Sequence, residues 1–533
     1  MTTEPAAAQP DPVLLDYVVV IPTLGRPCLQ DCLDALAGAD GPLPRQVVLT
    51  DDRPDTPEPL PVRIPAVLAG RTAVVTLEGR GPAAARNAGW RAAEPAEWVA
   101  FLDDDVRVGP HWRAELRADL AGQPADVAGV QGVIEVPLPP DRRPTDWERG
   151  TAGLASARWI TADLAYRRRA LLAAGGFDER FPRAFREDAD IALRLLDQGW
   201  TLRRGRRVTA HPVRPASRWA SLKAQAGNAD DVLMTRLHGR GWYQRAGGAP
   251  GRRRWHLLTS AALGLAVLAG TGRLVTARRD GGPHRNGRLT GAAAGAAGAA
   301  WLASTAEFTA ARVRPGPRTP DEITTMAITS TLIPPLAVRH WLRGQWRHRK
   351  VTPWPPPPAA VLFDRDGTLV RDVPYNGRPE LVEPMPGATV AVARLRAAGV
   401  RLGVVSNQSG VGRGLITAEQ MKAVNQRVED LLGPFGTWAI CPHDVADGCA
   451  CRKPAPLLVR QAAAELGVDP ADCVVIGDIG TDAAAAYAAG ARAVLVSTPA
   501  TRPEETQGVP TAADLAEAVT ALLDGPPLPS WRR

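Results

Sequence analysis

Two carboxylates one residue apart, Asp364 and Asp366, follow a short apolar run at residues 360–363. The run predicts a buried strand, and open α/β sheets bind their ligands at the carboxyl ends of such strands. A carboxylate attacks phosphorus poorly unless a cation offsets the repulsion, and Mg²⁺ accepts carboxylate and phosphate oxygens together. The pair therefore predicts phosphoryl chemistry, in which Asp364 attacks phosphorus and Asp366 protonates the leaving oxygen and later activates water. A solvated acidic turn is the alternative that this motif alone leaves open.

Three more polar clusters follow apolar runs downstream, so four strand ends contribute in order. They supply a hydroxyl, a cation and further carboxylates: Ser406 with Asn407, Gln408 and Ser409, then Lys453, then Asp478 with Asp482. Together with Asp364 they resemble the haloacid dehalogenase superfamily of phosphotransferases over roughly residues 358–503. The resemblance implies that Asp364, the backbone carbonyl of Asp366, and Asp478 hold Mg²⁺. It also implies that Ser406 and Lys453 stabilise an aspartyl-phosphate.

Three sulfurs and one imidazole lie within eleven residues, just before Lys453: Cys441, His443, Cys449 and Cys451. This is a ligand set for tetrahedral Zn²⁺. Two closely spaced pairs favour a metal over free buried thiols, which would not need the pairing. With all four positions filled by protein, the zinc is expected to be structural and to fix the loop that presents Arg452 and Lys453.

The pattern Cys-x-His…Cys-x-Cys-Arg-Lys-Pro resembles the D-glycero-D-manno-heptose 1,7-bisphosphate phosphatases. The histidinol-phosphate phosphatases share it, so the substrate stays open between the two. The resemblance implies a substrate pocket lined by residues 374–377 and by Asn407, Gln408, Ser409, Arg413 and Arg452.

The 533 residues are too many for one hydrophobic core and predict about three units. A hydrophobic content of 45% and a charged content of 23% are ordinary for a soluble globular protein. Six cysteines are too few for a disulfide scaffold, and the first ten residues show no secretory signal. We therefore expect a reducing cytoplasm.

Charge is unevenly distributed along the chain. Residues 201–350 hold 26 Lys and Arg against 6 Asp and Glu, a net charge of +20, whereas the whole chain carries +8. The remainder is therefore acidic, at −12. The basic middle is where an anionic surface would bind.

Apolar runs alternate with helical patterns through the amino-terminal hundred residues, which predicts a doubly wound parallel sheet. Asp103, Asp104 and Asp105 follow the run at residues 98–102. Three adjacent carboxylates are costly unless a cation offsets their repulsion, and a divalent metal that bridges a diphosphate is the natural partner. An exposed acidic turn is the alternative. Asp51 could accept a base or ribose donor, and Arg86 could bind a phosphate.

Residues 16–212 resemble the family-2 glycosyltransferases of the GT-A fold. The motifs that carry the resemblance are IPT ending at Thr23, Asp51, Arg86-Asn87, FLDDD, GGFDE and FREDAD. It implies that Asp103 and Asp105 hold Mn²⁺ or Mg²⁺ on a nucleotide-sugar diphosphate. His211 is a candidate for a further ligand, and a lone histidine that binds no metal is the alternative. The resemblance also implies that Asp188 is the base of an inverting displacement and that Thr23, Asp51, Arg86 and Asn87 bind substrate. A simpler interpretation is that Asp188, in the first turn of its helix, interacts favourably with the helix dipole. The stretch LTDDRPD departs from the usual Asp-Gly-Ser turn.

The basic middle contains three uncharged stretches, residues 257–272, 289–306 and 323–338, of 16, 18 and 16 residues. A spanning helix needs about 20 strongly apolar residues. Arginines flank the stretches, which predicts helices that lie in the headgroup layer of an anionic membrane. An Ala-rich bundle packed on the transferase is the alternative. Nucleic acid is not expected as a partner, because the arginines are not interleaved with stacking aromatics.

The sequence thus predicts two doubly wound α/β domains, a GT-A glycosyltransferase and a Rossmann-like haloacid dehalogenase domain, joined by a basic, mostly helical segment. The expected division is a tail at 1–15, the transferase at 16–245, the basic segment at 246–350, a proline-rich linker at 351–358, the phosphatase at 359–503, and a helix with a tail at 504–533. The expected function is bifunctional, with a sugar phosphate, a nucleotide sugar and a glycan or lipid-linked acceptor as ligands. The expected location is the cytoplasm, or the inner face of the membrane as a peripheral protein. A histidinol-phosphate phosphatase, and a membrane-surface binding protein with a vestigial transferase, are the competing hypotheses.

Overall fold

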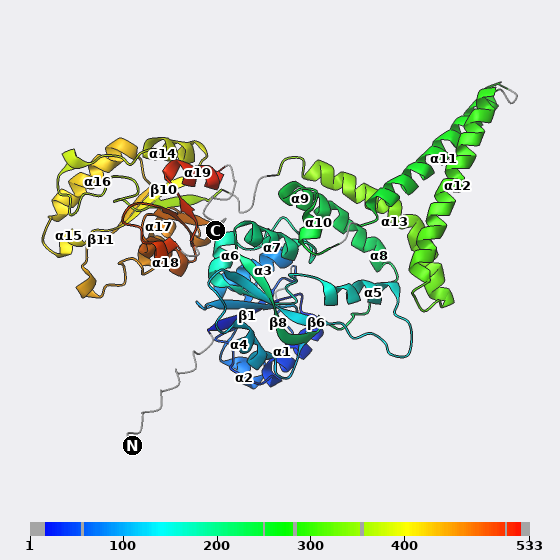
Figure 1. The fold of residues 1–533 in the computed structure, drawn as a ribbon, viewed down its shortest axis with the longest axis horizontal. Helices are drawn as coiled ribbons and strands as arrows, with labels where there is room; N and C mark the ends of the chain where they lie inside the picture. The colour runs from blue at the N-terminus through cyan, green and yellow to red at the C-terminus, as the bar shows by residue number, and fades with distance from the viewer. Residues whose placement is uncertain are drawn as a thin grey trace, which may run out of the picture.

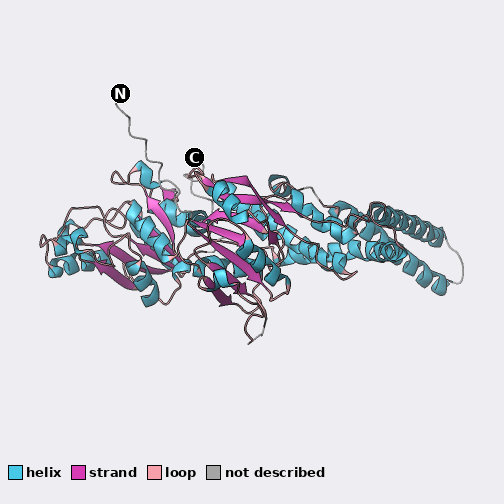
Figure 2. Cartoon of the chain, turned by 90° about the horizontal axis from the view of Figure 1, so that it is seen from below, coloured by secondary structure: helices cyan, strands magenta, loops and turns pink. Residues whose placement is uncertain are grey.

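The computed structural model describes residues 16–54, 58–248, 251–280, 285–351, 357–506 and 509–523, and for residues 275–280 and 285–288 it describes the backbone alone. The expected tail at 1–15, most of the proline-rich linker, and the end of the chain after residue 523 lie outside this range. Two sheet-containing domains lie side by side, and long helices extend beyond them (Figures 1 and 2).

The amino-terminal domain is built on an eight-stranded sheet in the order β3-β2-β1-β4-β7-β6-β8-β5. Its strands are β1 (Tyr17–Thr23), β2 (Val47–Asp51), β3 (Thr72–Thr76), β4 (Trp98–Leu102), β5 (Arg107–Val108), β6 (Val127–Glu135), β7 (Asp163–Arg167) and β8 (Thr201–Ala210). The first four strands are parallel, as predicted. Beyond these strands, β7 runs antiparallel to both of its neighbours, so the complete sheet is mixed. The sequence did not predict β8, because arginines interrupt its apolar pattern. Arg207 is nevertheless fully buried in this strand, because Asp119 and Asp163 pair with its guanidinium.

Helices cover both faces of this sheet, because alternate residues of each strand point to opposite sides. Tyr17, Val19 and Ile21 of β1 pack with α1 and α4, whereas Val18 and Val20 pack with α3, α6 and α7. The helices of this domain are α1 (Cys28–Gly38), α2 (Ala66–Ala69), α3 (Pro82–Ala92), α4 (Trp112–Leu120), α5 (Asp146–Ala152), α6 (Arg168–Ala174), α7 (Glu187–Asp197), α8 (Ala220–Lys223), α9 (Asn228–His238) and α10 (Trp242–Arg245).

The carboxyl-terminal domain has a six-stranded parallel sheet in the order β11-β10-β9-β12-β13-β14. Its elements are β9 (Ala360–Phe363), α14 (Ala388–Ala397), β10 (Arg401–Asn407), α15 (Ser409–Gly412), α16 (Ala418–Leu432), β11 (Thr437–Cys441), α17 (Leu457–Glu465), β12 (Cys473–Gly477), α18 (Gly480–Ala489), β13 (Arg492–Val496), β14 (Thr511–Ala512) and α19 (Leu515–Leu523). Buried side chains of α19 share a core cluster with α14 and α16, so the segment after residue 503 contributes to this domain. The central position of β9 brings the ends of β10 and β12 to either side of Asp364.

Three long helices make up the basic middle: α11 (Arg253–Asp280), α12 (Arg285–Val313) and α13 (Pro320–Arg347). They are longer than the uncharged stretches that predicted them, and α13 continues through Pro334-Pro335. α13 packs on α9, where Gly344 lies so close to Ala229 that a Cβ on the glycine would sit 2.8 Å from the Ala229 Cα. α11 and α12 instead run side by side away from the two sheet-containing domains, which are called the body below (Figure 1). Within the described residues, one segment, Arg253–Leu274, is long and apolar enough to cross a membrane by length and composition, with a mean hydropathy of 1.5.

Candidate active sites

In the carboxyl-terminal domain, the ends of β9 and β12 and the first turn of α18 bring three acids around the ammonium group of Lys453, which a loop supplies. Asp364, Asp478 and Asp482 each place a carboxylate oxygen within 4.8 Å of the other two. Lys453 Nζ lies 3.0 Å from Asp364 Oδ1 and 2.6 Å from Asp482 Oδ1, and it donates to the Val405 carbonyl at 2.9 Å. The structure thus brings the predicted Asp364, Lys453 and Asp478 together, and it adds Asp482 as the partner of Lys453.

The buried carboxylates of this cluster outnumber its one ammonium group. Burial, followed by the nearby carboxylates of Asp364 and Asp482, raises the pKa of Asp478 to about 7. Burial alone would lower the pKa of Lys453, but Asp364 and Asp482 together raise it, so the ammonium stays charged. Three buried acids around one cation fit a divalent ion, since carboxylate oxygens are the ligands that Mg²⁺ prefers.

The turn after β9 depends on glycine. Gly367 has φ +74°, and a Cβ at this position would lie 2.3 Å from Asp478 Oδ2. Any other residue would therefore be strained in its backbone and would push into the acid cluster.

Asp366 is held apart from the acid cluster by a different set of donors. Gln408 Nε2 donates to Asp366 Oδ2 at 2.8 Å and to Ser406 Oγ at 3.0 Å. The Arg365 guanidinium donates to both oxygens of Asp366 and to Gln408 Oε1. Gln408 thus links the predicted acid–base residue to the predicted hydroxyl donor.

The other predicted substrate residues of this domain differ in their contacts. Asn407 exchanges hydrogen bonds with the backbone of Lys453, at 3.0 and 3.2 Å, so it positions the lysine. Arg413 is partly exposed and donates to Tyr375 Oη and to Asp444, each at 2.8 Å. Ser409 is half-buried at the start of α15, and Arg452 donates to the His443 carbonyl at 3.3 Å.

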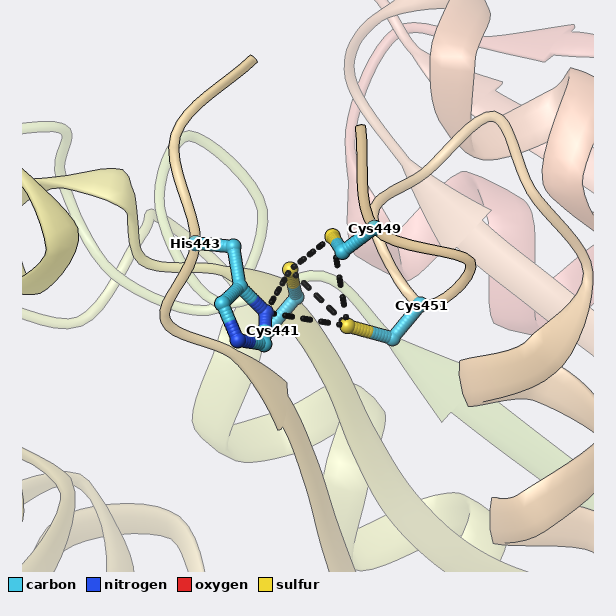
Figure 3. Close-up of side chains that lie close together, drawn as sticks. All are labelled: Cys441, His443, Cys449 and Cys451. Atoms are coloured by element: carbon cyan, nitrogen blue, oxygen red, sulfur yellow. Dashed lines mark hydrogen bonds between the residues drawn. The ribbon is translucent and has the colours of Figure 1, made fainter. Parts of the chain in front are cut away.

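The predicted zinc ligands converge on one point (Figure 3). Bond lengths of about 2.3 Å to sulfur and about 2.0 Å to nitrogen place tetrahedral ligands about 3.8 Å apart for two sulfurs and about 3.5 Å apart for a sulfur and a nitrogen. The three sulfurs lie 3.3–3.6 Å apart, and His443 Nδ1 lies 3.7 Å from Cys441 Sγ and 3.3 Å from Cys451 Sγ. The four side chains therefore fit one zinc ion with all positions filled by protein.

The amino-terminal domain assembles its own acid cluster at the end of β4. Asp103, Asp105 and His211 each place a possible ligand atom within 4.8 Å of the others, as the sequence predicted. Asp104 is used differently, since it accepts hydrogen bonds from Thr23 Oγ1 at 2.7 Å and from Arg26 at 3.0 Å. Thr23 thereby fixes the acidic turn.

The surroundings of the Asp105 carboxylate suit the binding of a cation. Burial, followed by the charge of Asp103, raises the pKa of Asp105. His211 Nε2 lies 3.6 Å from one oxygen of Asp105 and the Arg214 guanidinium lies 2.8 Å from the other. His211 Nδ1 is buried with no hydrogen-bond partner. The His211 imidazole grouped with the carboxylates of Asp103 and Asp105 offers ligands that fit Mn²⁺ or Mg²⁺.

Arg86 is the buried cation of this site. Its guanidinium lies 2.9 Å from Asp103, 2.9 Å from Glu187 and 3.7 Å from Asp188. Burial alone would lower the pKa of Arg86, but these carboxylates together raise it. Among the described residues, Arg86 therefore pairs with three acids, and its contact with a phosphate stays a prediction.

Asp188 accepts two hydrogen bonds from Thr161, from its Oγ1 at 2.7 Å and from its backbone N–H at 3.1 Å. Burial raises the pKa of Asp188 despite Arg86 and these donors, and burial followed by Asp188 raises the pKa of Glu187 to about 8. A carboxylate whose pKa is raised is a stronger base, which suits proton abstraction.

Two predicted substrate residues have other work in the structure. Asn87 accepts from the Phe177 N–H and donates to the Phe177 carbonyl and to Glu179, so it holds the GGFDE loop against α3. The Asp51 carboxylate is bound by the Arg53 guanidinium at 2.7–3.0 Å, and this hydrogen bonding lowers its pKa. The stretch LTDDRPD thus supplies its own cation where the sequence suggested a free acceptor.

Sequence reasoning missed Thr161 and the residues that hold the loop before Asp188. Arg186 has φ +81°, which is unusual for a side chain of its size. Its guanidinium stacks on Phe185 and on Trp242 of α10, and it donates to Asp231 of α9 at 2.8 Å. The run FREDAD could have drawn attention to Arg186, but nothing local marks Thr161, Asp231 or Trp242.

Comparison with known proteins agrees with this division. Family models match residues 18–182 as Glycosyl transferase family 2 and residues 450–522 as HAD-hydrolase-like. The D-glycero-beta-D-manno-heptose-1,7-bisphosphate 7-phosphatase of Pseudomonas aeruginosa is 36% identical over 143 residues, which are 26% of this chain and 80% of that protein. A crystal structure of the D,D-heptose 1,7-bisphosphate phosphatase from B. bronchiseptica, with magnesium and phosphate, is 31% identical and covers 31% of this chain and 97% of its own, with a TM-score of 0.28. A mannosyltransferase from Pyrobaculum calidifontis, with GDP-Man and Mn²⁺, is 18% identical and covers 64% of this chain and 91% of its own, with a TM-score of 0.33.

Proposed function

Because the chain belongs, through its carboxyl-terminal domain, to the family of the D-glycero-β-D-manno-heptose-1,7-bisphosphate 7-phosphatases, and carries a family-2 glycosyl transferase domain before it, we propose that one polypeptide removes the 7-phosphate of a heptose bisphosphate and transfers a sugar from a nucleotide donor. The observation that carries the first activity is the contact of Lys453 with Asp364 and Asp482 beside Asp478. A histidinol-phosphate phosphatase remains the competing outcome of the test below.

In the phosphatase, Asp364 attacks phosphorus and the bond to the sugar oxygen breaks, while Asp366 gives its proton to that oxygen. Asp366 then accepts a proton from water, whose oxygen attacks the aspartyl-phosphate and releases phosphate and Asp364. Lys453 and Ser406 stabilise the phosphoryl oxygens. Asn407 holds Lys453 in place, and Gln408 holds Ser406. Asp364, the Asp366 carbonyl and Asp478 would hold Mg²⁺, which would neutralise charge on the phosphoryl group.

In the transferase, Asp188 takes the proton of an acceptor hydroxyl as its oxygen attacks the sugar opposite the departing diphosphate, which inverts the anomeric carbon. Thr161 aims the Asp188 carboxylate and Arg86 keeps it ionised. Asp103, Asp105 and His211 would hold Mn²⁺ or Mg²⁺, which would neutralise the leaving diphosphate. The acceptor that we propose is a glycan or a lipid-linked sugar.

The zinc site supports the phosphatase without entering its chemistry. Cys449 and Cys451 precede Arg452 and Lys453 directly, so a zinc ion on the four ligands would hold the lysine loop. Thiols that stay reduced to bind a metal favour the cytoplasm, where we place both active sites.

Product analysis on the full-length chain tests the phosphatase. With Mg²⁺, D-glycero-β-D-manno-heptose 1,7-bisphosphate should lose one phosphate, and ³¹P NMR should show that the phosphate on C1 remains. Metal analysis should find one zinc per chain. Faster turnover of histidinol phosphate, or loss of the phosphate on C1, would contradict the proposal.

A further inference from the structure

The hairpin formed by α11 and α12 carries an uncharged band on both of its helices. Residues 255–272 of α11 and residues 289–306 of α12 contain no Asp, Glu, Lys or Arg, and each stretch is 18 residues long. A helix rises about 1.5 Å per residue, so each band is about 27 Å long. The hydrocarbon layer of a bilayer is about 30 Å thick.

The two bands lie in register. Near the body, Arg252 pairs with Glu307, and the His256 ring contacts the Phe308 ring at 5.2 Å between centroids. Toward the far end, a Cβ on Gly291 would lie 2.6 Å from the guanidinium of Arg273. The separation between the contact residues is 17 positions on each helix, so the ends of the two bands coincide.

Apolar side chains cover the outside of the hairpin. Eight large ones are between 54% and 71% exposed: Trp255, Leu258, Leu265, Val267, Leu268, Leu274, Leu289 and Leu302. A soluble monomer seldom leaves so many large apolar residues uncovered on one element. Both segments are α-helical, and an α-helix pairs the backbone polar groups of its interior, as a lipid environment requires.

Charge marks the boundaries of the band. Arg252, Arg253 and Arg254 stand at the end next to the body, and Arg273 follows the band on α11. In the sequence, Arg288 directly precedes the band of α12. Arginines at the level of the headgroups attract anionic lipids, and their long side chains can reach the interface.

The third helix behaves differently, which argues against a bundle packed on the transferase as the account of all three. α13 buries Met326, Ile333 and Ala337 against the protein. Arg312, at the base of α12, is bound to Asp146 at 2.7 Å and to Thr329 of α13 at 2.8 Å. The base of the hairpin is therefore fastened to the transferase, whereas its uncharged band extends away from it (Figure 1).

We propose that the α11–α12 hairpin inserts into a bilayer that contains anionic lipids. The match between the band and the hydrocarbon layer, and the arginines at its edges, favour insertion over the surface-lying helices that the sequence suggested. Insertion would hold the transferase beside the membrane. The use of that position, access to a lipid-linked acceptor, rests on the proposed function.

Flotation of the full-length chain with vesicles tests the insertion. The wild type should float with phosphatidylcholine–phosphatidylglycerol vesicles (3:1) and should stay bound in 1 M NaCl, because salt screens headgroup attraction and not burial of apolar surface. The double variant Leu265→Glu/Leu268→Glu should lower the bound fraction at least tenfold. The matched control Val390→Glu/Leu415→Glu, at exposed apolar residues of the phosphatase domain, should float like the wild type.

Far-ultraviolet circular dichroism spectra should be equal for all of these proteins, which shows that they are folded and, because no substrate is used, separates this test from that of the proposed function. Complete release by 1 M NaCl would overturn insertion in favour of a headgroup contact. Flotation of the Leu265→Glu/Leu268→Glu variant at the wild-type level, or a wild type that remains in solution as a dimer, would overturn it as well.

Discussion

The two active sites share one electrostatic arrangement and use it differently. In each, a single buried cation lies among three carboxylates: Lys453 among Asp364, Asp478 and Asp482, and Arg86 among Asp103, Glu187 and Asp188. The ammonium of Lys453 contacts the proposed nucleophile itself. The guanidinium of Arg86 instead bridges the proposed metal ligands and the proposed base.

The difference follows from the geometry of the two cations. Lysine is a point charge that can serve a phosphoryl oxygen, whereas the planar guanidinium forms several fixed hydrogen bonds and can connect carboxylates on separate elements. A negative excess remains in both sites, which is the physical reason to expect a divalent ion in each. The comparison therefore predicts that Lys453 acts directly on substrate and that Arg86 acts through its neighbours.

Removal of the ammonium should have the largest effect. Lys453→Gln leaves three buried carboxylates without a cation and removes a donor to the phosphoryl group, so kcat/KM for phosphate release should fall on the order of 10³-fold. Steady-state phosphate release measures it, with the exposed Lys422→Gln as the control. A decrease of less than tenfold would remove Lys453 from the chemistry.

Arg86→Gln should reduce transfer on the order of 10²-fold, because Asp103, Glu187 and Asp188 lose their shared partner. Hydrolysis of nucleotide sugars from a panel of GDP- and UDP-sugars, with Mn²⁺, gives the readout. Arg91→Gln, one turn further along α3 and exposed, is the matched control. Transfer at the wild-type rate in Arg86→Gln would break the comparison between the two cations.

Asp482→Asn should have a smaller effect, because Asp482 holds Lys453 and does not touch the substrate in our account. We expect kcat for phosphate release to fall about ten- to hundredfold while KM changes little, since one buried charged hydrogen bond is weakened. Asp430→Asn, at an exposed residue of α16, is the control. A rise in KM at unchanged kcat would instead assign Asp482 to substrate binding.

Thr161→Val should have the smallest effect, a shift in pH dependence. The hydroxyl of Thr161 donates to ionised Asp188 and thereby lowers its pKa, so removing the donor raises that pKa further. The acid limb of transfer should then move to higher pH by about one unit, since a hydrogen bond to a charged group contributes about 1.5 kcal/mol.

Thr161→Ser, which keeps the donor, should retain the wild-type pH profile. If the acid limb of Thr161→Val stays in place or moves to lower pH, Asp188 is not the group whose ionisation limits transfer.

The structure brings together most of the residues that sequence patterns proposed for the phosphatase site, because a parallel sheet gathers the carboxyl ends of its strands at one edge. Asp364, Ser406 and Asp478 each end a strand, and the zinc ligands are neighbours in the chain, so local spacing was enough. The transferase site was predicted less fully. Thr161 reaches Asp188 only because β7 enters the sheet antiparallel, and no local motif predicts that pairing.

Roles were harder to predict than positions. Arg86 and Asn87 were correctly placed in the site region, but the sequence could not show that their polar atoms are used by Asp103, Glu187 and the GGFDE loop. The pairing of Asp51 with Arg53, two residues later, was likewise not predicted. Long-range packing decides these pairings, and composition does not record it.

The central claim is that one chain holds two separate active sites, one organised by Lys453 and the other by Arg86. Assaying phosphate release and nucleotide-sugar turnover on the same preparations of Asp364→Asn and Asp188→Asn tests it most directly. The account predicts that Asp364→Asn abolishes phosphate release and leaves sugar turnover unchanged, and that Asp188→Asn does the reverse. Phosphate release that survives Asp364→Asn, or a single substitution that abolishes both activities in a folded chain, would contradict it.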